Sequence, residues 1–297
     1  MIPPLSTPGL DLTERVAIVT GAGGRIGRAI STMLTGAGAR VMIHDLDGAR
    51  SEGVAGLLSA RGGTVMSMHG DIADPERAQD LVEMAVAVWQ APDIVINCAG
   101  VFPNTPVMEL SDAAWHHVFG VNLHGPFYLA RAAARAMVAA HDAGQQHPRH
   151  IINISSTAGE SARRGAAHYC SSKAALNMLT KTLAIELAQW DIHVNAVAPG
   201  IIVDQVLQQP MPEGADPYVA ALLDGVPLGR TGHGNDIANA VAFLISPAAT
   251  WITGEILHVN GGSTAGRVAL PRSTFAGHDV PAPQGDAVTD VAGPSHA

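Results

Sequence analysis

The sequence of 297 residues is poor in aromatic side chains and in cysteine. Phe, Trp and Tyr make up 4 % of it, although 47 % of the residues are apolar. Its core must therefore consist mostly of Ala, Val, Ile and Leu, which suits helices packed on a sheet better than an aromatic-rich β sandwich. The two cysteines, Cys98 and Cys170, have no metal-ligand spacing and do not indicate a disulfide framework. We therefore expect a protein of the reducing cytoplasm.

Basic clusters and long apolar runs are also absent. The formal net charge is −9, and no block of Lys and Arg stands out, which argues against nucleic acid or an anionic membrane surface as the main partner. No apolar run approaches the ~18–20 residues of a membrane span, and the first ten residues do not resemble a secretion signal. The 14 histidines include no HExxH or comparable spacing, so we expect no metal site.

Short apolar runs alternate with segments of helical periodicity. Strands are expected at 16–20, 40–45, 64–69, 93–97, 150–155, 193–198 and 255–259, and helices near 26–35, 47–60, 75–89, 111–140, 167–189 and 234–246. This alternation predicts βαβ units. The fold class is therefore α/β, a doubly wound, Rossmann-like parallel sheet of about seven strands with helices on both faces.

The two ends of the chain differ from the rest. Residues 1–12 contain three prolines and are expected to form an irregular arm. Residues 266–297 contain four Gly and four Pro without apolar periodicity, which is typical of a flexible tail. Residues 13–265 are expected to form a single domain.

A glycine-rich segment, TGAGGRIG at 20–27, follows the first expected strand and opens a helix. Glycines allow a tight turn and a close approach of a pyrophosphate to the backbone, and the helix N-terminus supplies unpaired N–H groups. Asp45 ends the second expected strand, where a carboxylate accepts hydrogen bonds from an adenosine ribose and repels a 2′-phosphate. The pattern favours NAD over NADP. The alternative is a plain turn followed by a solvated or helix-capping Asp.

Tyr169 and Lys173 are four residues apart and so share one face of the helix expected at 167–189. Ser156 lies thirteen residues before Tyr169, directly after the strand expected at 150–155. A phenol, an ammonium and a hydroxyl brought together can move a proton on and off an alcohol oxygen. Each residue alone has an ordinary interpretation as a surface or turn residue, so the prediction depends on the set.

These motifs, taken in order, resemble the short-chain dehydrogenase/reductase family of the compact, single-domain kind, from about residue 13 to about residue 265. The segment 20–27 is similar to the family's TGxxxGxG, Asn97-Cys98-Ala99-Gly100 to its NNAG, and Ser156, Tyr169 and Lys173 to its Ser…YxxxK set. Asn122, Pro199-Gly200 and the segment 253–262 also match family positions.

The resemblance implies hydride transfer between a nicotinamide and a secondary alcohol or ketone. It assigns Tyr169 as general acid/base, Lys173 as the charge that tunes it and holds the nicotinamide ribose, Ser156 as the group that polarises the reacting oxygen, and Asn122 as the anchor of a water beside Lys173. The cofactor is expected to be NAD, with NADP as the alternative. Its predicted binding residues are Gly21, Gly23, Arg25, Ile26, Gly27, Asp45, Asp71, Ile72, Asn97, Ala99, Gly100, Tyr169, Lys173, Pro199, Gly200 and Ile202.

Two residues depart from the family pattern. Arg25 replaces the middle glycine of the turn, and such a cation could bind a cofactor phosphate, reach over the substrate or point into solvent. If it contacts a 2′-phosphate, the preference for NAD weakens. Asp204 stands where the family has a Thr that bonds the nicotinamide carboxamide. An ionised Asp can accept from that amide but cannot donate.

The substrate side is less defined. Residues 203–226 lie where the family has a variable lid and are expected to form a mobile apolar flap. Phe102, Glu160 and His168 are further candidates for the substrate site. The resemblance also implies a homotetramer, with 123–140 and 174–188 as contact surfaces. Alternatives are an NADPH-dependent carbonyl or 3-oxoacyl reductase, a non-catalytic dinucleotide-binding regulator, and a lyase or epimerase that uses NAD transiently.

Overall fold

The computed structural model describes residues 9–208 and 217–266. The strands are β1 (Val16–Thr20), β2 (Arg40–Asp45), β3 (Thr64–His69), β4 (Ile94–Asn97), β5 (Arg149–Ile154), β6 (Ile192–Pro199) and β7 (Ile256–Val259). The helices are α1 (Arg25–Gly36), α2 (Gly48–Ser59), α3 (Pro75–Val88), α4 (Asp112–Phe119), α5 (Gly125–Asp142), α6 (Ala167–Leu187), α7 (Pro217–Leu223) and α8 (Gly234–Leu244). Much of the predicted arm and tail, and residues 209–216 of the predicted flap, lie outside the described residues.

The seven strands form one sheet in the order β3-β2-β1-β4-β5-β6-β7, and every pair in it is parallel. The predicted doubly wound parallel sheet is therefore confirmed. The strand order reverses between β1 and β4, where the chain leaves β1 for α1 and leaves β4 in the opposite direction. At such a switch point, the loops at the carboxyl ends of neighbouring strands diverge and leave room for a ligand.

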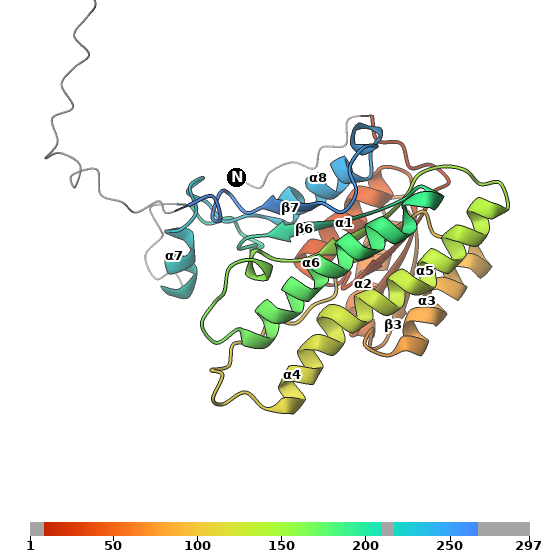
Figure 1. Cartoon of the computed structure of the whole chain (residues 1–297). Helices are drawn as coiled ribbons and strands as arrows, with labels where there is room; N and C mark the ends of the chain where they lie inside the picture. Colours follow the sequence, from red (N-terminus) through yellow and green to blue (C-terminus); the bar gives the residue numbers. More distant parts are fainter. Residues whose placement is uncertain (1–8, 209–216, 267–297) are drawn as a thin grey trace, which may run out of the picture.

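Helices cover both faces of the sheet. One face carries α1, α2 and α8, whose apolar residues share a core with β1, β2 and β4. The other face carries α3, α5 and α6, which run side by side in Figure 1. Most core residues on both faces are Ala, Val, Ile, Leu and Met. The small side chains let the helices pack close to the sheet, as the composition predicts.

The helix predicted at 111–140 is not uniform. A π-helical turn, Gly120–His124, separates α4 from α5, and the N–H of Gly125 bonds the carbonyl of Gly120. Pro126 follows directly and has no N–H to donate to the preceding turn, which favours the wider winding. Single π turns of this kind often place a functional side chain, and here Asn122 lies in the middle of the turn. The short helix α7 was not predicted.

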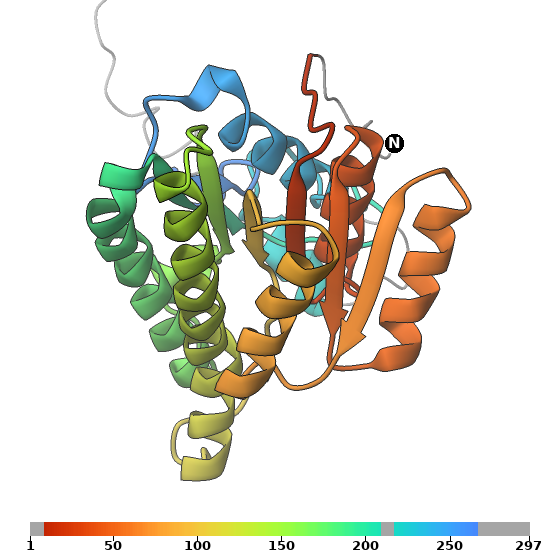
Figure 2. The same cartoon turned by 90° about the vertical axis from the view of Figure 1, so that its right-hand side faces the viewer.

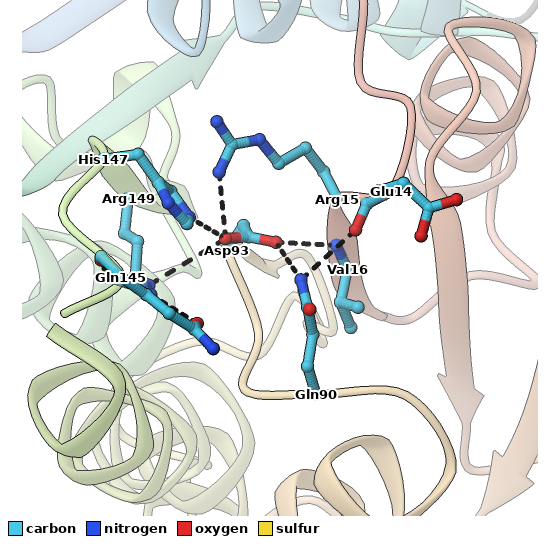
Figure 3. Close-up of polar contacts among 8 residues, drawn as sticks. All are labelled: Glu14, Arg15, Val16, Gln90, Asp93, Gln145, His147 and Arg149. Atoms are coloured by element: carbon cyan, nitrogen blue, oxygen red, sulfur yellow. Dashed lines mark hydrogen bonds and ion pairs between the residues drawn. The ribbon is translucent and has the colours of Figure 1, made fainter. Parts of the chain in front are cut away.

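The amino ends of the strands meet around a buried carboxylate. Asp93, only 2 % exposed, precedes β4, and its Oδ2 accepts the Val16 N–H at 2.9 Å. Arg15, His147 and Arg149 approach Oδ1, the last two from the β5 side, as Figure 3 shows. Asp93 thus ties together the starts of β1, β4 and β5. This Asp93 cluster lies at the opposite edge of the sheet from the glycine-rich turn.

Within the described residues, no helix is both long enough and apolar enough to cross a membrane.

Candidate active site

The glycine-rich turn is held against the loop that follows β4. The Thr20 hydroxyl accepts hydrogen bonds from the backbone N–H groups of Cys98, at 3.1 Å, and Ala99, at 3.2 Å. Gly21 has a φ of +64°, and a Cβ there would lie 2.7 Å from the Ala99 Cα. Any side chain at position 21 would therefore push the two loops apart. The contact fixes the turn after β1 against the loop after β4, the two segments that flank the switch point.

The N-terminus of α1 carries the features of an anion site. The helix begins at Arg25 after Gly24, no side chain of the described residues caps it, and its first turn contains no acid. The first N–H groups of such a helix have no intrahelical acceptors, and the helix dipole favours negative charge there. The small Gly23 and Gly24 leave the backbone open to approach. These features fit a dinucleotide pyrophosphate, and Ile26 and Gly27 complete the same first turn.

Asp45 ends β2 beside this turn. Its carboxylate accepts the Gly23 N–H at 3.0 Å and the Asp47 N–H at 3.1 Å. A carboxylate has about four acceptor positions, so further positions remain for ribose hydroxyls. Gly23 is needed here, since a Cβ would lie 3.0 Å from the Asp45 Oδ2. A carboxylate with such remaining acceptor positions has the chemistry that a ribose site needs.

The loop after β3 supplies the next predicted contacts. Asp71 is exposed, and its Oδ1 accepts the Ala73 N–H at 2.9 Å. Ile72 is buried against Gly125, where an added Cβ would lie 2.9 Å from the Ile72 Cγ2. Both residues follow β3 at the carboxyl edge of the sheet, and their contact with a cofactor stays a prediction. Asn97, by contrast, turns into the core, where its amide donates to Asn153 at 2.8 Å. The Asn97 side chain thus joins β4 to β5.

The carboxyl end of β6 forms the far side of the site. Gly200 follows the last residue of β6, Pro199, and packs so closely that a Cβ would lie 3.0 Å from Asn260. Ile202 forms an isolated bridge with Gly232, and the Val203 N–H donates to the Gly232 carbonyl at 3.0 Å. These contacts fix the backbone up to the residue before Asp204.

Asn122 fastens the loop after β4 to the helices. Its Oδ1 accepts the Val101 N–H at 2.9 Å, and its Nδ2 donates to the Val101 carbonyl at 2.8 Å and to the Ser172 hydroxyl at 3.2 Å. Gly100 lies under this amide, and a Cβ there would be 3.4 Å from the Asn122 Oδ1 and 3.8 Å from the Lys173 Nζ. Asn122 from the π turn and Lys173 from α6 therefore both lie next to Gly100 in the loop after β4.

Lys173 is buried, with 4 % of its surface exposed, and its Nζ donates to the Ile154 carbonyl at 2.7 Å. Burial lowers the pKa of Lys173 from 10.5 to about 8. The ammonium thus lies at the carboxyl end of β5. Burial also raises the pKa of the neighbouring Cys98 thiol to about 12, so this thiol stays protonated and unreactive at neutral pH.

Tyr169 lies one helical turn before Lys173 on α6, beside the loops that follow β4 and β5. Phe102 packs edge-on against its ring, with centroids 6.4 Å apart, and the Arg163 guanidinium lies 5.3 Å from the ring centroid. Ser156, 8 % exposed, lies two residues after β5, and its Oγ accepts the Ala158 N–H at 3.1 Å. Sequence reasoning named Tyr169, Ser156 and Phe102 but missed Arg163, because nothing in its spacing marks it.

Arg25 and Asp204, the two residues that depart from the family pattern, contact each other. The Arg25 Nε donates to the Asp204 Oδ2 at 2.6 Å, and the Arg28 Nη2 donates to the other carboxylate oxygen at 3.3 Å. The Arg25 guanidinium is therefore paired with a residue that follows β6. No sequence spacing could have joined residues 179 positions apart.

The remaining candidates have other surroundings. Glu160 lies 3.1 Å from the His258 Nε2 on β7. His168 is fully buried, both its ring nitrogens lack a hydrogen-bond partner among the described residues, and burial lowers its pKa. The described residues contain no group of three or more His, Cys, Asp or Glu placed to hold a metal ion.

The chain is similar to known proteins over most of its length. A family model described as enoyl-(acyl carrier protein) reductase matches residues 21–264. The chain is 38 % identical to the (3R)-3-hydroxyacyl-CoA dehydrogenase of Rattus norvegicus, over 85 % of this chain and 97 % of that protein. It is 37 % identical to the 3-oxoacyl-(acyl-carrier-protein) reductase FabG of Escherichia coli (strain K12), over 85 % of this chain and 98 % of that protein.

A solved structure shows the same likeness. A short-chain type dehydrogenase/reductase from Mycobacterium marinum aligns with a TM-score of 0.78 at 28 % identity, covering 88 % of this chain and 100 % of that one.

Proposed function

The chain belongs to the short-chain dehydrogenase/reductase family and is an oxidoreductase acting on CH–OH or C=O groups, and we propose that it uses NAD(H), with Tyr169 as general acid/base. One observation carries the proposal. Tyr169 and the buried Lys173 share a face of α6, and Lys173 is bonded to the carboxyl end of β5, the edge of the sheet at which α1 also begins, without a side-chain cap, after β1. The acid/base group and the dinucleotide cradle thus occupy the same edge of the sheet.

The proposed chemistry starts from the phenol of Tyr169. A free Tyr has a pKa near 10 and is a poor base at neutral pH. The ammonium of Lys173, buried one turn away, favours the phenolate because opposite charges attract strongly where water is excluded. The cation of Arg163 over the ring acts in the same direction. Tyr169 then takes the hydroxyl proton in oxidation and returns it in reduction.

The other residues prepare this proton transfer. Ser156 offers its hydroxyl to the reacting oxygen and polarises it. Asn122 holds the loop at Val101, since its amide makes both bonds to that backbone. A bound nicotinamide cofactor supplies the hydride or accepts it.

The choice of NAD over NADP rests on Asp45. Its carboxylate is held at the ribose position by Gly23 and Asp47, and a negative charge there repels a 2′-phosphate. Arg25 begins α1 and contacts Asp204 rather than Asp45, so we assign its guanidinium to the pyrophosphate side of the cofactor and not to a 2′-phosphate. NADP as the working cofactor is the alternative.

Both curated relatives are named for acyl thioester substrates, and one local feature favours the same class here. Phe102, 71 % exposed, and the cation of Arg163 flank Tyr169. An apolar ring beside a cation suits an acyl chain carried by an anionic group. The second candidate function is therefore reduction of a 3-oxoacyl thioester.

The wider setting is also part of the proposal. We place the enzyme in the cytoplasm as a homotetramer, with residues 13–265 as one catalytic domain and a small alcohol or carbonyl compound as substrate. The low cysteine content supports the cytoplasmic placement, and the resemblance to the family supports the tetramer.

The test begins with the purified full chain and titrations with NADH and NADPH, read by calorimetry. The preferred cofactor is then offered with a panel of simple ketones and of 3-oxoacyl thioesters, and the nicotinamide absorbance is followed. We expect tighter binding of NADH and turnover of at least one class. Binding of neither dinucleotide would refute the proposal, and turnover confined to simple ketones would remove the thioester alternative.

A further inference from the structure

Arg25, Arg28 and Asp204 form a charged bridge, here named the Arg25–Asp204 clasp. We propose that Arg25 exchanges Asp204 for a cofactor phosphate when the dinucleotide binds, so that Asp204 competes with the cofactor and lowers its affinity. This inference rests on the proposed function, because it concerns the same dinucleotide site. It makes Arg25 and Asp204 a pair of positioning residues that set how tightly the cofactor is held.

The clasp joins two elements that are distant in the sheet. Arg25 is the first residue of α1, directly after the turn from β1, whereas Asp204 follows the end of β6. In the sheet order, β4 and β5 lie between these two strands. The clasp therefore reaches across the carboxyl edge, where the dinucleotide is expected. The Val203 N–H donates to the Gly232 carbonyl, and this hydrogen bond holds the backbone directly before Asp204 in place.

The clasp is exposed and hence readily opened. The side chains of Arg25 and Asp204 are 54 % and 55 % exposed, and that of Arg28 is 52 % exposed. Ion pairs in such surroundings contribute little to stability and are screened by salt. The contact of Arg25 uses its Nε, and a guanidinium has several further N–H donors with which to meet a phosphate. Little free energy therefore opposes an exchange of partners.

The position of Arg25 supplies the reason for an exchange. Its own backbone N–H belongs to the helix terminus that fits a pyrophosphate, so its side chain starts at the anion site. A pyrophosphate carries more negative charge than one carboxylate and attracts the guanidinium more strongly. After the exchange Asp204 would still have its ion pair with Arg28, whose Nη2 lies 3.3 Å from Oδ1, so the charge of the Asp204 carboxylate is still partly compensated. Its remaining negative charge opposes the binding of an anion nearby.

The experiment measures the dissociation constant of NADH by calorimetry, without substrate, for Asp204→Asn, Arg25→Ala and the double variant. We expect Asp204→Asn to tighten NADH binding by about two- to five-fold, the range set by an exposed ion pair. Arg25→Ala should weaken binding by at least as much. In the Arg25→Ala background, Asp204→Asn should have a smaller effect, because the competition for Arg25 is gone. Raising the salt concentration should reduce the difference between Asp204→Asn and the unchanged protein.

The control is Glu14→Gln, which removes one negative charge from another partly exposed ion pair, that with Arg40 at the opposite edge of the sheet. It should leave the NADH dissociation constant unchanged. Thermal unfolding of each variant checks that it is folded.

The proposal would be overturned if Asp204→Asn left NADH affinity unchanged or weakened it, or if the effects of the two substitutions simply added. If the unchanged protein bound neither NADH nor NADPH, the proposed function itself would fail, and that result differs from a failure of the clasp.

Discussion

The two edges of the sheet use polar groups in opposite ways. At the amino edge, Asp93 is buried and surrounded by donors from Val16, Arg15 and His147 (Figure 3). At the carboxyl edge, the first turn of α1 is left uncapped by the described residues. The first arrangement uses its hydrogen bonds inside the protein and joins strands. The second leaves N–H groups available for a ligand, at the edge where Figure 2 shows the strands of the sheet ending together.

The sharpest test of the amino edge is Asp93→Asn. Removing this buried carboxylate leaves Arg149, which is fully buried, without its nearest opposite charge. Loss of one partner of a buried pair costs about 3–5 kcal/mol, and we expect the free energy of unfolding in urea to fall by that amount. NADH affinity, measured where the variant is still folded, should not change. A loss of less than about 1 kcal/mol is what an exposed carboxylate such as Asp204 would give. It would contradict the claim that Asp93 stabilises the fold at the amino edge.

A pH series tests how much the burial of the Lys173 ammonium at the carboxyl edge destabilises the folded protein. Burial lowers the pKa of Lys173 to about 8 from 10.5, so between these pH values the unfolded chain binds more protons than the folded one. Stability from this group therefore rises with pH across the window from about 8 to 10.5, by up to ~3 kcal/mol. The difference in unfolding free energy between the unchanged protein and Lys173→Met should show this rise.

Lys181 is exposed on the same helix, and Lys181→Met is the matched control. It should show no such rise. An equal, pH-independent difference for both variants would mean that Lys173 is not held as a buried ammonium.

A smaller effect is expected at Asp45. Asp45→Ala removes the carboxylate proposed to bond the ribose and repel a 2′-phosphate. The ratio of the NADPH to NADH dissociation constants should fall by about ten-fold, in line with the loss of a hydrogen bond to a charged group. Asp47→Ala, which removes the N-terminal cap of α2 next to it, serves as the control and should leave the ratio unchanged. An unaltered ratio in Asp45→Ala would remove this residue from cofactor selection.

The sequence predicts the parts of this protein that depend on local pattern. The strands 16–20, 40–45 and 64–69 were predicted with the bounds that β1, β2 and β3 have, because apolar runs between turn residues define them. The order of the family motifs indicated the family, which the comparisons confirm. The roles of the individual site residues stay predictions.

Other features depend on contacts between distant residues. The π turn around Asn122 arises from the winding of a helix whose periodicity reads as continuous. The pairing of Arg25 with Asp204 could not be inferred from either position alone, although each was noted as a departure. Asp93 begins the strand expected at 93–97, and only the fold shows that Arg15, His147 and Arg149 converge on it. Such convergence has no local signature.

The central claim is that the Tyr169 hydroxyl transfers the proton at the carboxyl edge. Tyr169→Phe removes that hydroxyl alone and keeps the ring that packs against Phe102. With a substrate found in the panel, we predict a loss of kcat on the order of 10²–10⁴-fold, with unchanged NADH affinity and thermal stability. Turnover by Tyr169→Phe at the rate of the unchanged protein would contradict the account.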